Sequence, residues 1–181
     1  MKKIALIATI AFAAPFVKAQ VYVGTENSVI SFFSHTSMED IDAKNTNCKA
    51  FVLKAETGEF VCQAANKGFT FKSGLMQEHF NENYMESDKY QYSKFSGKIA
   101  DKIDYKKDGV YKVTMEGKMD IHGVVKDVKI PGTITVKGDI IQVDAKFNIA
   151  MKDYNIRIPE AVGNKFAEAM ELTVKGELKK K

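Results

Sequence analysis

The sequence has no tryptophan, only three histidines, three prolines and two cysteines, and it lacks several motifs that mark enzymes. No H-E-x-x-H helix, G-x-S-x-G elbow or Gly-rich phosphate loop is present, so the usual signatures of zinc proteases, α/β-hydrolases and nucleotide-binding enzymes are missing. Neither cysteine has an evident histidine or asparagine partner for nucleophilic catalysis. A pair of catalytic carboxylates could only be chosen arbitrarily among 23 acidic residues. These absences favour a protein that is not an enzyme.

A hydrophobic run long enough to cross a membrane is also missing. The apolar run at residues 4–16 follows Lys2 and Lys3 and is too short for a bilayer, which needs roughly 20 residues. Val17-Lys18-Ala19 offers small residues at both recognition positions for signal cleavage. We therefore predict a signal peptide at residues 1–19, cleaved after Ala19, and a single mature domain at residues 20–181. No cysteine follows the run, so a lipid anchor is not expected, and the exported protein is expected in the periplasm rather than fully secreted.

A strong excess of positive charge is lacking once the signal peptide is set aside. The full chain has a net charge of +4, and loss of the three lysines in the leader lowers it to about +1. Binding to nucleic acid is therefore not predicted.

The two cysteines, Cys48 and Cys62, are predicted to be free and half-buried. Thr57-Gly58 is the expected turn between the strands that carry them, and a two-residue loop there would set Leu53 opposite Cys62. Cys48 would then lie roughly 17 Å further along its strand, which is beyond the reach of a disulfide. An exported protein lies where disulfides can form, so a bridge stays the alternative.

Apolar and polar residues alternate with a period of two along most of the mature chain, which predicts strands with one buried face. The clearest case runs from Val110 to Ile121. Its apolar face consists of Tyr111, Val113, Met115, Gly117, Met119 and Ile121. Further strands are predicted at residues 28–34, 50–54, 59–64, 68–72, 92–100, 128–136, 141–151 and 170–178. His122-Gly123 is predicted to be a turn with an exposed, inert histidine.

Long strands joined by short turns predict a mostly β protein, an antiparallel barrel of about eight strands, because closure leaves no unpaired edge. Small residues share the inward faces with large ones, namely Gly117, Gly132, Gly176 and Ala145. They could leave space for one small ligand inside a barrel of this size. Alternatively the barrel is filled, and the glycines relieve crowding or mark bulges. The pattern does not decide between the two.

Helical patterns occur in two segments, 76–88 and 159–169. The first contains the acidic stretch QEHFNENYMESDKY. In a helix, His79, Glu82 and Glu86 would share one face at i, i+3 and i+7 and could ligate a metal. The preferred interpretation is a short amphipathic helix whose acids face water. In that case the packing residues would be Met76, Phe80, Tyr84 and Met85.

Seven short motifs follow one another with a characteristic order and spacing. They are Phe69-x-Phe71, LMQEHFNE at 75–82, MESDKY at 85–90, Phe95-x-Gly97, GKMDIHGV at 117–124, KIP at 129–131 and DYNIRIP at 153–159. In these motifs the chain resembles the YceI-like family of exported, lipocalin-like barrels that bind polyisoprenoids and other long-chain lipids. Two features depart from the family pattern: the segment at 42–65 is shorter and more polar, and Gln91 stands where a proline is common.

The resemblance implies a lipocalin-like barrel with one or two short helices and an apolar tunnel for an isoprenoid or acyl chain, with this lipid as ligand and no cofactor. Burial of such a chain contributes roughly 0.8 kcal/mol per CH₂. His79 is expected near the polar head group. The residues expected to contact the tail are Phe69, Phe71, Met76, Phe80, Met85 and Phe95 near the entrance, and Tyr111, Val113, Met115, Met119 and Phe147 along the strands. A metal-dependent enzyme and a filled barrel acting through its surface are the alternatives, and transient membrane contact and a homodimer stay open.

Overall fold

The computed structural model of the chain describes residues 20–48 and 50–181, whose strands all belong to one antiparallel sheet. The predicted signal peptide lies outside the described residues. The strands are β1 (Val21–Gly24), β2 (Val29–His35), β3 (Asp40–Asn45), β4 (Ala50–Lys54), β5 (Glu59–Ala65), β6 (Thr70–Phe71), β7 (Tyr92–Ile99), β8 (Gly109–Ile121), β9 (Val124–Lys137), β10 (Ile140–Ala150) and β11 (Ala169–Lys180). The helical elements are η1 (Asn66–Gly68), α1 (Gly74–His79), the π-helical turn η2 (Phe80–Tyr84), η3 (Met151–Tyr154) and η4 (Glu160–Lys165).

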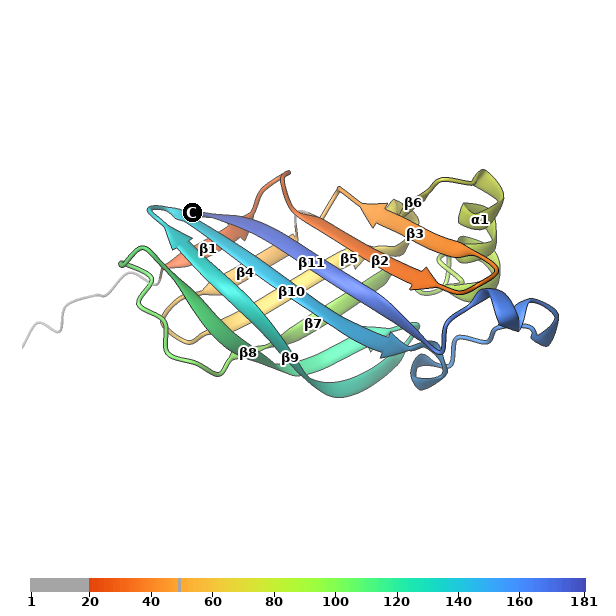
Figure 1. Ribbon diagram of the computed structural model, residues 1–181. Helices are drawn as coiled ribbons and strands as arrows, with labels where there is room; N and C mark the ends of the chain where they lie inside the picture. Colours follow the sequence, from red (N-terminus) through yellow and green to blue (C-terminus); the bar gives the residue numbers. More distant parts are fainter. Residues whose placement is uncertain (1–19, 49) are drawn as a thin grey trace, which may run out of the picture.

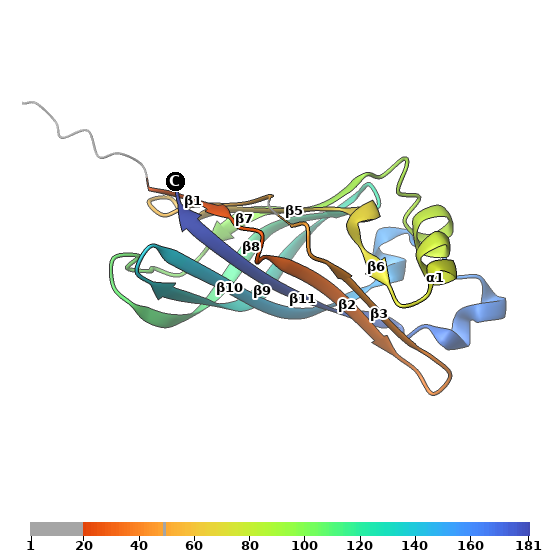
Figure 2. The same ribbon diagram turned by 90° about the horizontal axis from the view of Figure 1, so that it is seen from above.

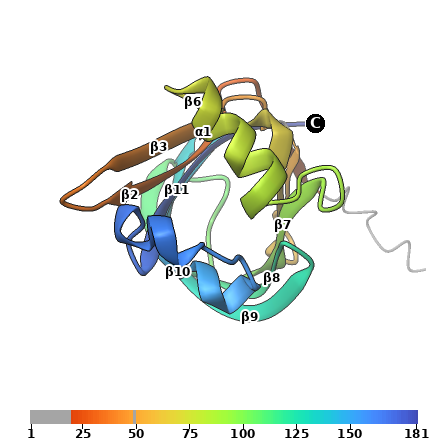
Figure 3. The same ribbon diagram turned by 90° about the vertical axis from the view of Figure 1, so that its right-hand side faces the viewer.

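Eight strands form the predicted closed barrel, in the order β1-β4-β5-β7-β8-β9-β10-β11. The ring closes because the end of β11 pairs with β1, with Tyr22 opposite Lys180. Figure 1 shows the strongly tilted strands from the side, with the C-terminus at one end of the barrel and α1 at the other. Figure 3 looks at the α1 end and shows the strands around a common axis.

The N-terminal half of β11 pairs with β2 instead of β1, so the ring of eight strands is not closed along this part of β11. Residues Glu171 to Lys175 pair with β2, which continues into β3 and then β6. The change of partner occurs beside Glu177, whose side chain accepts hydrogen bonds from Thr25 Oγ1 (2.9 Å) and Asn27 Nδ2 (2.7 Å). The β2–β3 hairpin therefore extends away from the ring, as Figure 2 shows, and β6 leads directly into α1.

The end of the barrel near β1 is filled with side chains. Its fully buried residues include Tyr22, Leu53, Ile134, Ile141 and Leu178. Tyr105, in the connection between β7 and β8, packs over this end with its ring 6.1 Å from that of Tyr22. No helix among the described residues is long and apolar enough to span a membrane.

The alternating pattern predicted the long strands correctly, but three local predictions were wrong. Residues 68–72 contain only the two-residue strand β6, because the 3-10 helix η1 occupies the preceding positions. Residues 159–169 form the 3-10 helix η4 rather than an α-helix, and Ala169 already pairs with Ala150 in the sheet. Strands β1 and β3 were not predicted, since β1 has only four residues and polar residues occupy four of the six positions of β3.

The predicted register of the β4–β5 hairpin was also wrong. Leu53 lies opposite Phe60, and Phe51 lies opposite Cys62. The turn is longer than two residues, with the Gly58 amide donating to the Lys54 carbonyl (2.9 Å) and Gly58 at φ +68°. Such a backbone conformation favours glycine, so Gly58 closes a four-residue turn rather than a two-residue one.

The inward-facing glycines make room for neighbouring large side chains. A Cβ on Gly176 would lie 2.9 Å from Phe51 Cε1, and one on Gly132 would lie 2.9 Å from Met115 Cε. These two glycines therefore relieve crowding inside the barrel, although the barrel is not filled along its whole length, because a cavity lies toward α1.

Candidate functional site

A cavity of about 360 Å³ occupies the part of the barrel toward α1. Its wall is mainly apolar, with side chains from both the barrel and the elements that cover its end. The apolar lining residues include Ile30, Phe32, Ile41, Phe60, Phe69, Phe71, Met76, Phe80, Met85, Phe95, Met115, Met119, Ile121, Phe147, Ile149, Met151, Ile156, Phe166, Met170 and Leu172. Six of the lining side chains are methionines, which adapt to irregular ligands because they are flexible and polarizable.

Four phenylalanines pack together between the cavity and the helical segment. The ring of Phe80 lies 5.0 Å from that of Phe71, 5.5 Å from that of Phe32 and 5.7 Å from that of Phe69. These are favourable aromatic separations, worth about 0.5–1.5 kcal/mol per pair beyond area burial. The cluster brings together residues of β2, β6 and η2 and holds the helical segment against the cavity.

The helical segment starts at a defined cap and changes its winding halfway. Ser73 Oγ accepts a hydrogen bond from the Met76 amide (3.4 Å), and the side chain of Gln77 accepts one from the Phe71 amide (3.4 Å). After α1 the chain forms a π-helical turn, in which the hydrogen-bonded residues are five apart in the sequence: the Met85 amide donates to the Phe80 carbonyl (2.8 Å). Such turns often occur at functional sites.

The metal cluster considered from the sequence does not form. The π-helical turn breaks the i, i+3, i+7 spacing, and Glu86, with φ +42°, turns toward His122 instead of His79. Among residues 20–48 and 50–181, no group of three or more histidine, cysteine, aspartate or glutamate side chains could hold a metal ion.

Polar side chains lie at the rim of the cavity, where the β2–β3 hairpin meets η4. His79, Glu39 and Lys165 all line the cavity, and Lys165 Nζ lies 3.3 Å from Glu39 Oε2. Tyr84 packs edge-on against Phe166 with ring centroids 5.3 Å apart, and burial raises the pKa of Tyr84. The rim thus combines charged groups with a phenol, which suits contact with the polar end of an amphiphile.

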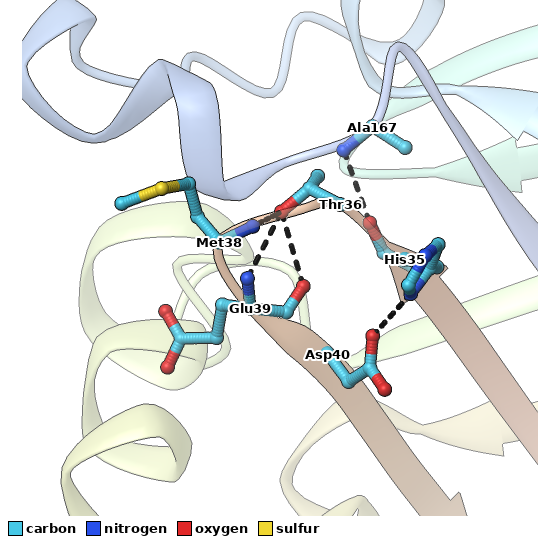
Figure 4. A network of polar contacts seen from close by, with 7 residues as sticks. His35, Thr36, Met38, Glu39, Asp40 and Ala167 are labelled. Atoms are coloured by element: carbon cyan, nitrogen blue, oxygen red, sulfur yellow. Dashed lines mark hydrogen bonds and ion pairs between the residues drawn. The ribbon is translucent and has the colours of Figure 1, made fainter.

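The hairpin at this rim is held by a small hydrogen-bond network (Figure 4). Thr36 Oγ1 accepts from the amides of Met38 (3.2 Å) and Glu39 (3.1 Å) and donates to the Glu39 carbonyl. The buried Ser34 Oγ accepts from the Ala167 amide (3.1 Å), which ties the hairpin to the segment after η4. His35 pairs with Asp40 at 2.5 Å on the exposed face.

The prediction of an exposed, inert His122 was wrong. Its side chain is buried, with Nε2 2.9 Å from Glu86 Oε2 and Nδ1 3.2 Å from the Tyr154 carbonyl oxygen. The Tyr90 ring covers the turn, with its centroid 4.3 Å from that of His122. The hairpin turn is therefore a contact point that joins the end of the helical segment to η3.

The structure brings most of the residues predicted to bind ligand to this cavity. Those that line it are Phe69, Phe71, Met76, His79, Phe80, Met85, Phe95, Met115, Met119 and Phe147. Tyr111 and Val113 do not line it. They share the inward face of β8 but lie nearer the filled end, where the Tyr111 hydroxyl donates to the Lys107 carbonyl (3.1 Å).

Several lining residues were not predicted. Ile30 and Phe32 come from β2, Ile41 from β3, and Met151 and Phe166 from the connection around η3 and η4. The apolar character of residues 30–33 was visible in the sequence, but the pairing of β2 with β11, which brings them to the cavity, was not.

Both thiols are free and buried, and Cys62 lines the cavity. Burial raises the pKa of Cys48 to about 11. Burial also raises the pKa of Cys62 strongly. Protonated thiols are poor nucleophiles, so Cys62 contributes to the wall as a small apolar side chain.

Solved structures share this fold over most of the chain, although their sequences are distant. A polyisoprenoid-binding domain from Saccharophagus degradans has a TM-score of 0.71 at 12% identity, with 91% of this chain and 100% of that domain covered. BcnA of Burkholderia cenocepacia has a TM-score of 0.68 at 16% identity over 86% and 98% of the two chains. A YceI protein of Campylobacter jejuni has a TM-score of 0.58 at 15% identity over 100% and 99%.

Among curated proteins no sequence matches this chain. The model of one family, described as the YceI-like domain, matches residues 20–178. This range includes every strand of the barrel except the last two residues of β11. The chain therefore belongs to the YceI-like domain family.

Proposed function

We propose that this protein binds a long-chain isoprenoid or another amphipathic lipid without converting it chemically, and carries or sequesters it in the periplasm. The observation that supports this most directly is the apolar cavity of about 360 Å³ inside the barrel. Its volume falls in the range of small-molecule pockets, about 300–1,000 Å³. The relative from Saccharophagus degradans, described as a polyisoprenoid-binding domain, is consistent with the same class of ligand.

The lining favours a tail over a polar ligand. An apolar chain that leaves water for this cavity gains roughly 0.8 kcal/mol for each buried CH₂, whereas a polar group placed among Phe60, Met119 and Phe147 would lose its hydrogen bonds with water. The polar head then remains at the rim beside His79, Glu39 and Lys165. Export to the periplasm rests on the leader sequence at residues 1–19.

Native mass spectrometry and solvent extraction of protein purified without detergent test the proposal. We expect a bound lipid that is released on unfolding and identified in the extract. Recovery of a ligand-free protein that takes up no isoprenoid, fatty acid or N-phenylnaphthylamine, a fluorescent apolar probe, would overturn it.

Two lysine substitutions on β8 distinguish binding in the cavity from binding on the barrel surface. Met119 is buried in the cavity wall, whereas Val110 is 70% exposed on the same strand. Met119→Lys places an ammonium group in the cavity and should reduce uptake of N-phenylnaphthylamine strongly, since burial of a charge is costly. Val110→Lys should bind the probe as the wild type does. Equal binding by both variants, with circular dichroism showing both folded, would contradict the cavity as the binding site.

A further inference from the structure

The cavity ends partway along the barrel. On β8 its lining stops at Met115, and on β10 it stops at Val143. The next inward residues toward the filled end, Val113 and Ile141, do not line it. The lower part of the barrel is therefore closed to a ligand by packed side chains.

A row of large side chains crosses the barrel at this level. The ring of Phe60 lies 6.2 Å from that of Phe51 and 6.1 Å from that of Phe95. All three rings are at most 5% exposed, and Met115 on β8, the strand next to that of Phe95, is 3% exposed. We call Phe51, Phe60, Phe95 and Met115 the floor of the cavity, so Phe95 lies at the floor rather than near the entrance, as was predicted from the sequence.

Glycines beside three of the floor residues give them space: Gly176 and Gly132 lie on other strands, and Gly97 lies on the same strand as Phe95. A Cβ would lie 2.9 Å from Phe51 Cε1 at Gly176, 2.8 Å from Phe95 Cζ at Gly97 and 2.9 Å from Met115 Cε at Gly132. Each floor residue other than Phe60 thus rests against a glycine that has no side chain. The glycines and the floor together determine where the cavity stops.

We propose that this floor limits the bound tail to about twelve main-chain atoms, a length set by the following geometry. The lining on β8 runs from Met115 to Ile121, which is about 20 Å along a strand. Strands of an eight-stranded barrel tilt by about 35–45°, so the cavity is about 15 Å deep along the axis. An extended chain advances about 1.2 Å per single bond, one third of the length of an extended residue, so about twelve bonds fit.

The ligand class that follows is an amphiphile whose tail is a medium-length acyl chain or about three isoprene units, each with about four main-chain atoms. A longer tail would leave its remainder outside the barrel, where it gains nothing from burial. This inference rests on the proposed function, because it concerns the same cavity, and it narrows that function from long-chain lipids in general to amphiphiles whose buried tail is of medium length.

Competition of straight-chain fatty acids with N-phenylnaphthylamine tests the limit directly in the wild-type protein. Affinity should rise about fourfold for each added CH₂ up to a chain of about twelve carbons and then become level. A rise that continues to chains of about twenty carbons would overturn the limit while leaving lipid binding intact. If no chain of any length binds, the proposed function itself fails.

Three variants then test whether the floor sets the limit. Phe60→Ala removes the central ring of the floor. It should move the break, the chain length at which affinity stops rising in the fatty-acid series, to longer chains. Gly176→Ala should move it to shorter chains, because the new Cβ displaces the Phe51 ring toward Phe60. Phe80→Ala is the matched control at the opposite end, and it should lower all affinities without moving the break. A break that stays in place in Phe60→Ala, with the variant shown to be folded by its thermal transition, would overturn the assignment of the floor.

Discussion

Replacement of Gly117 by alanine should destabilise the barrel through a direct backbone clash. Gly117 on β8 lies opposite Gly97 on β7, and a Cβ on it would lie 2.4 Å from Gly97 Cα and 2.4 Å from the Ser96 carbonyl oxygen. Both atoms belong to the backbone, so no side chain can rotate away and the two strands must separate. Overpacking of this kind costs about 1–3 kcal/mol, and alanine recovers only about 0.4–1 kcal/mol by restricting the unfolded chain.

The overpacking cost should lie in the upper part of its range, because both clashing atoms belong to the backbone, so the net loss of stability should be about 2 kcal/mol. A domain of this size loses about 2–4 °C of melting temperature per kcal/mol. Differential scanning calorimetry should therefore place Gly117→Ala about 4–8 °C below the wild type. Gly74→Ala is the control, because a Cβ at the start of α1 meets nothing within 4 Å. It should leave the melting temperature unchanged or raise it by up to about 4 °C. Equal melting temperatures for the two variants would refute the reasoning.

Three further predictions concern the thiols, the His122 contact and the rim. Burial raises the pKa of Cys48 to about 11 from the ordinary 9.0, so between these pH values the folded state keeps a proton that the unfolded chain releases. The free energy of unfolding, measured with urea, should be unaffected by this thiol below about pH 9 and should fall between about pH 9 and pH 11. In Cys48→Ala this free energy should fall less over the same pH range. In a double-mutant cycle of His122→Asn and Glu86→Gln, the coupling should be about 1 kcal/mol, because the carboxylate is half-exposed, and additive effects would count against the contact. Ser34→Ala should cost about 1 kcal/mol by leaving the Ala167 amide without its acceptor, with faster hydrogen exchange at that amide and no such change in Ser31→Ala.

The alternation of residues was sufficient to predict the barrel because its period reports a local property. A strand with one buried face requires an apolar residue at every second position, whatever its neighbours are. Residues 111–121 and 170–178 meet this requirement, with glycine at one inward position in each, and both lie within continuous strands. The four residues of β1 carry too few repeats of the pattern to differ from a loop, and β3 was missed because polar residues occupy four of its six positions.

Strand register depends on turn length and was less predictable. Thr57-Gly58 has the composition of a two-residue turn, yet Lys54 and Glu59 flank a longer one and form an ion pair at 2.6 Å. The expectation of free thiols therefore agrees with the structure although the register from which it was reasoned was wrong. Cys62 lies opposite Phe51, and Cys48 lies in the interruption between β3 and β4, where its Sγ donates to the Asn45 carbonyl (3.3 Å).

The cavity was predictable on one side only. Residues on β7, β8 and β10 belong to long strands whose inward faces could be assigned, so Phe95, Met115 and Phe147 were found. The opposite wall depends on which strand β11 pairs with, and its change of partner from β1 to β2 occurs beside Glu177, which accepts hydrogen bonds from Thr25 and Asn27. No local pattern records that change, so Phe32 and Ile41 were not recognised as lining residues.

His122 illustrates why a local pattern can give the right structure and the wrong environment. The prediction of a turn at His122-Gly123 was correct, and His122 adopts φ +53° with Gly123 at φ +73°. Turns usually lie in solvent because their backbone groups need water, which is why an exposed histidine was expected. Here Tyr90 covers the turn, and a Cβ on Gly123 would lie only 2.6 Å from its ring. Glu86 reaches the same histidine from 36 residues away. The histidine thus connects the end of the segment that covers the cavity to the barrel, so substitutions at this turn should alter access to the cavity as well as stability.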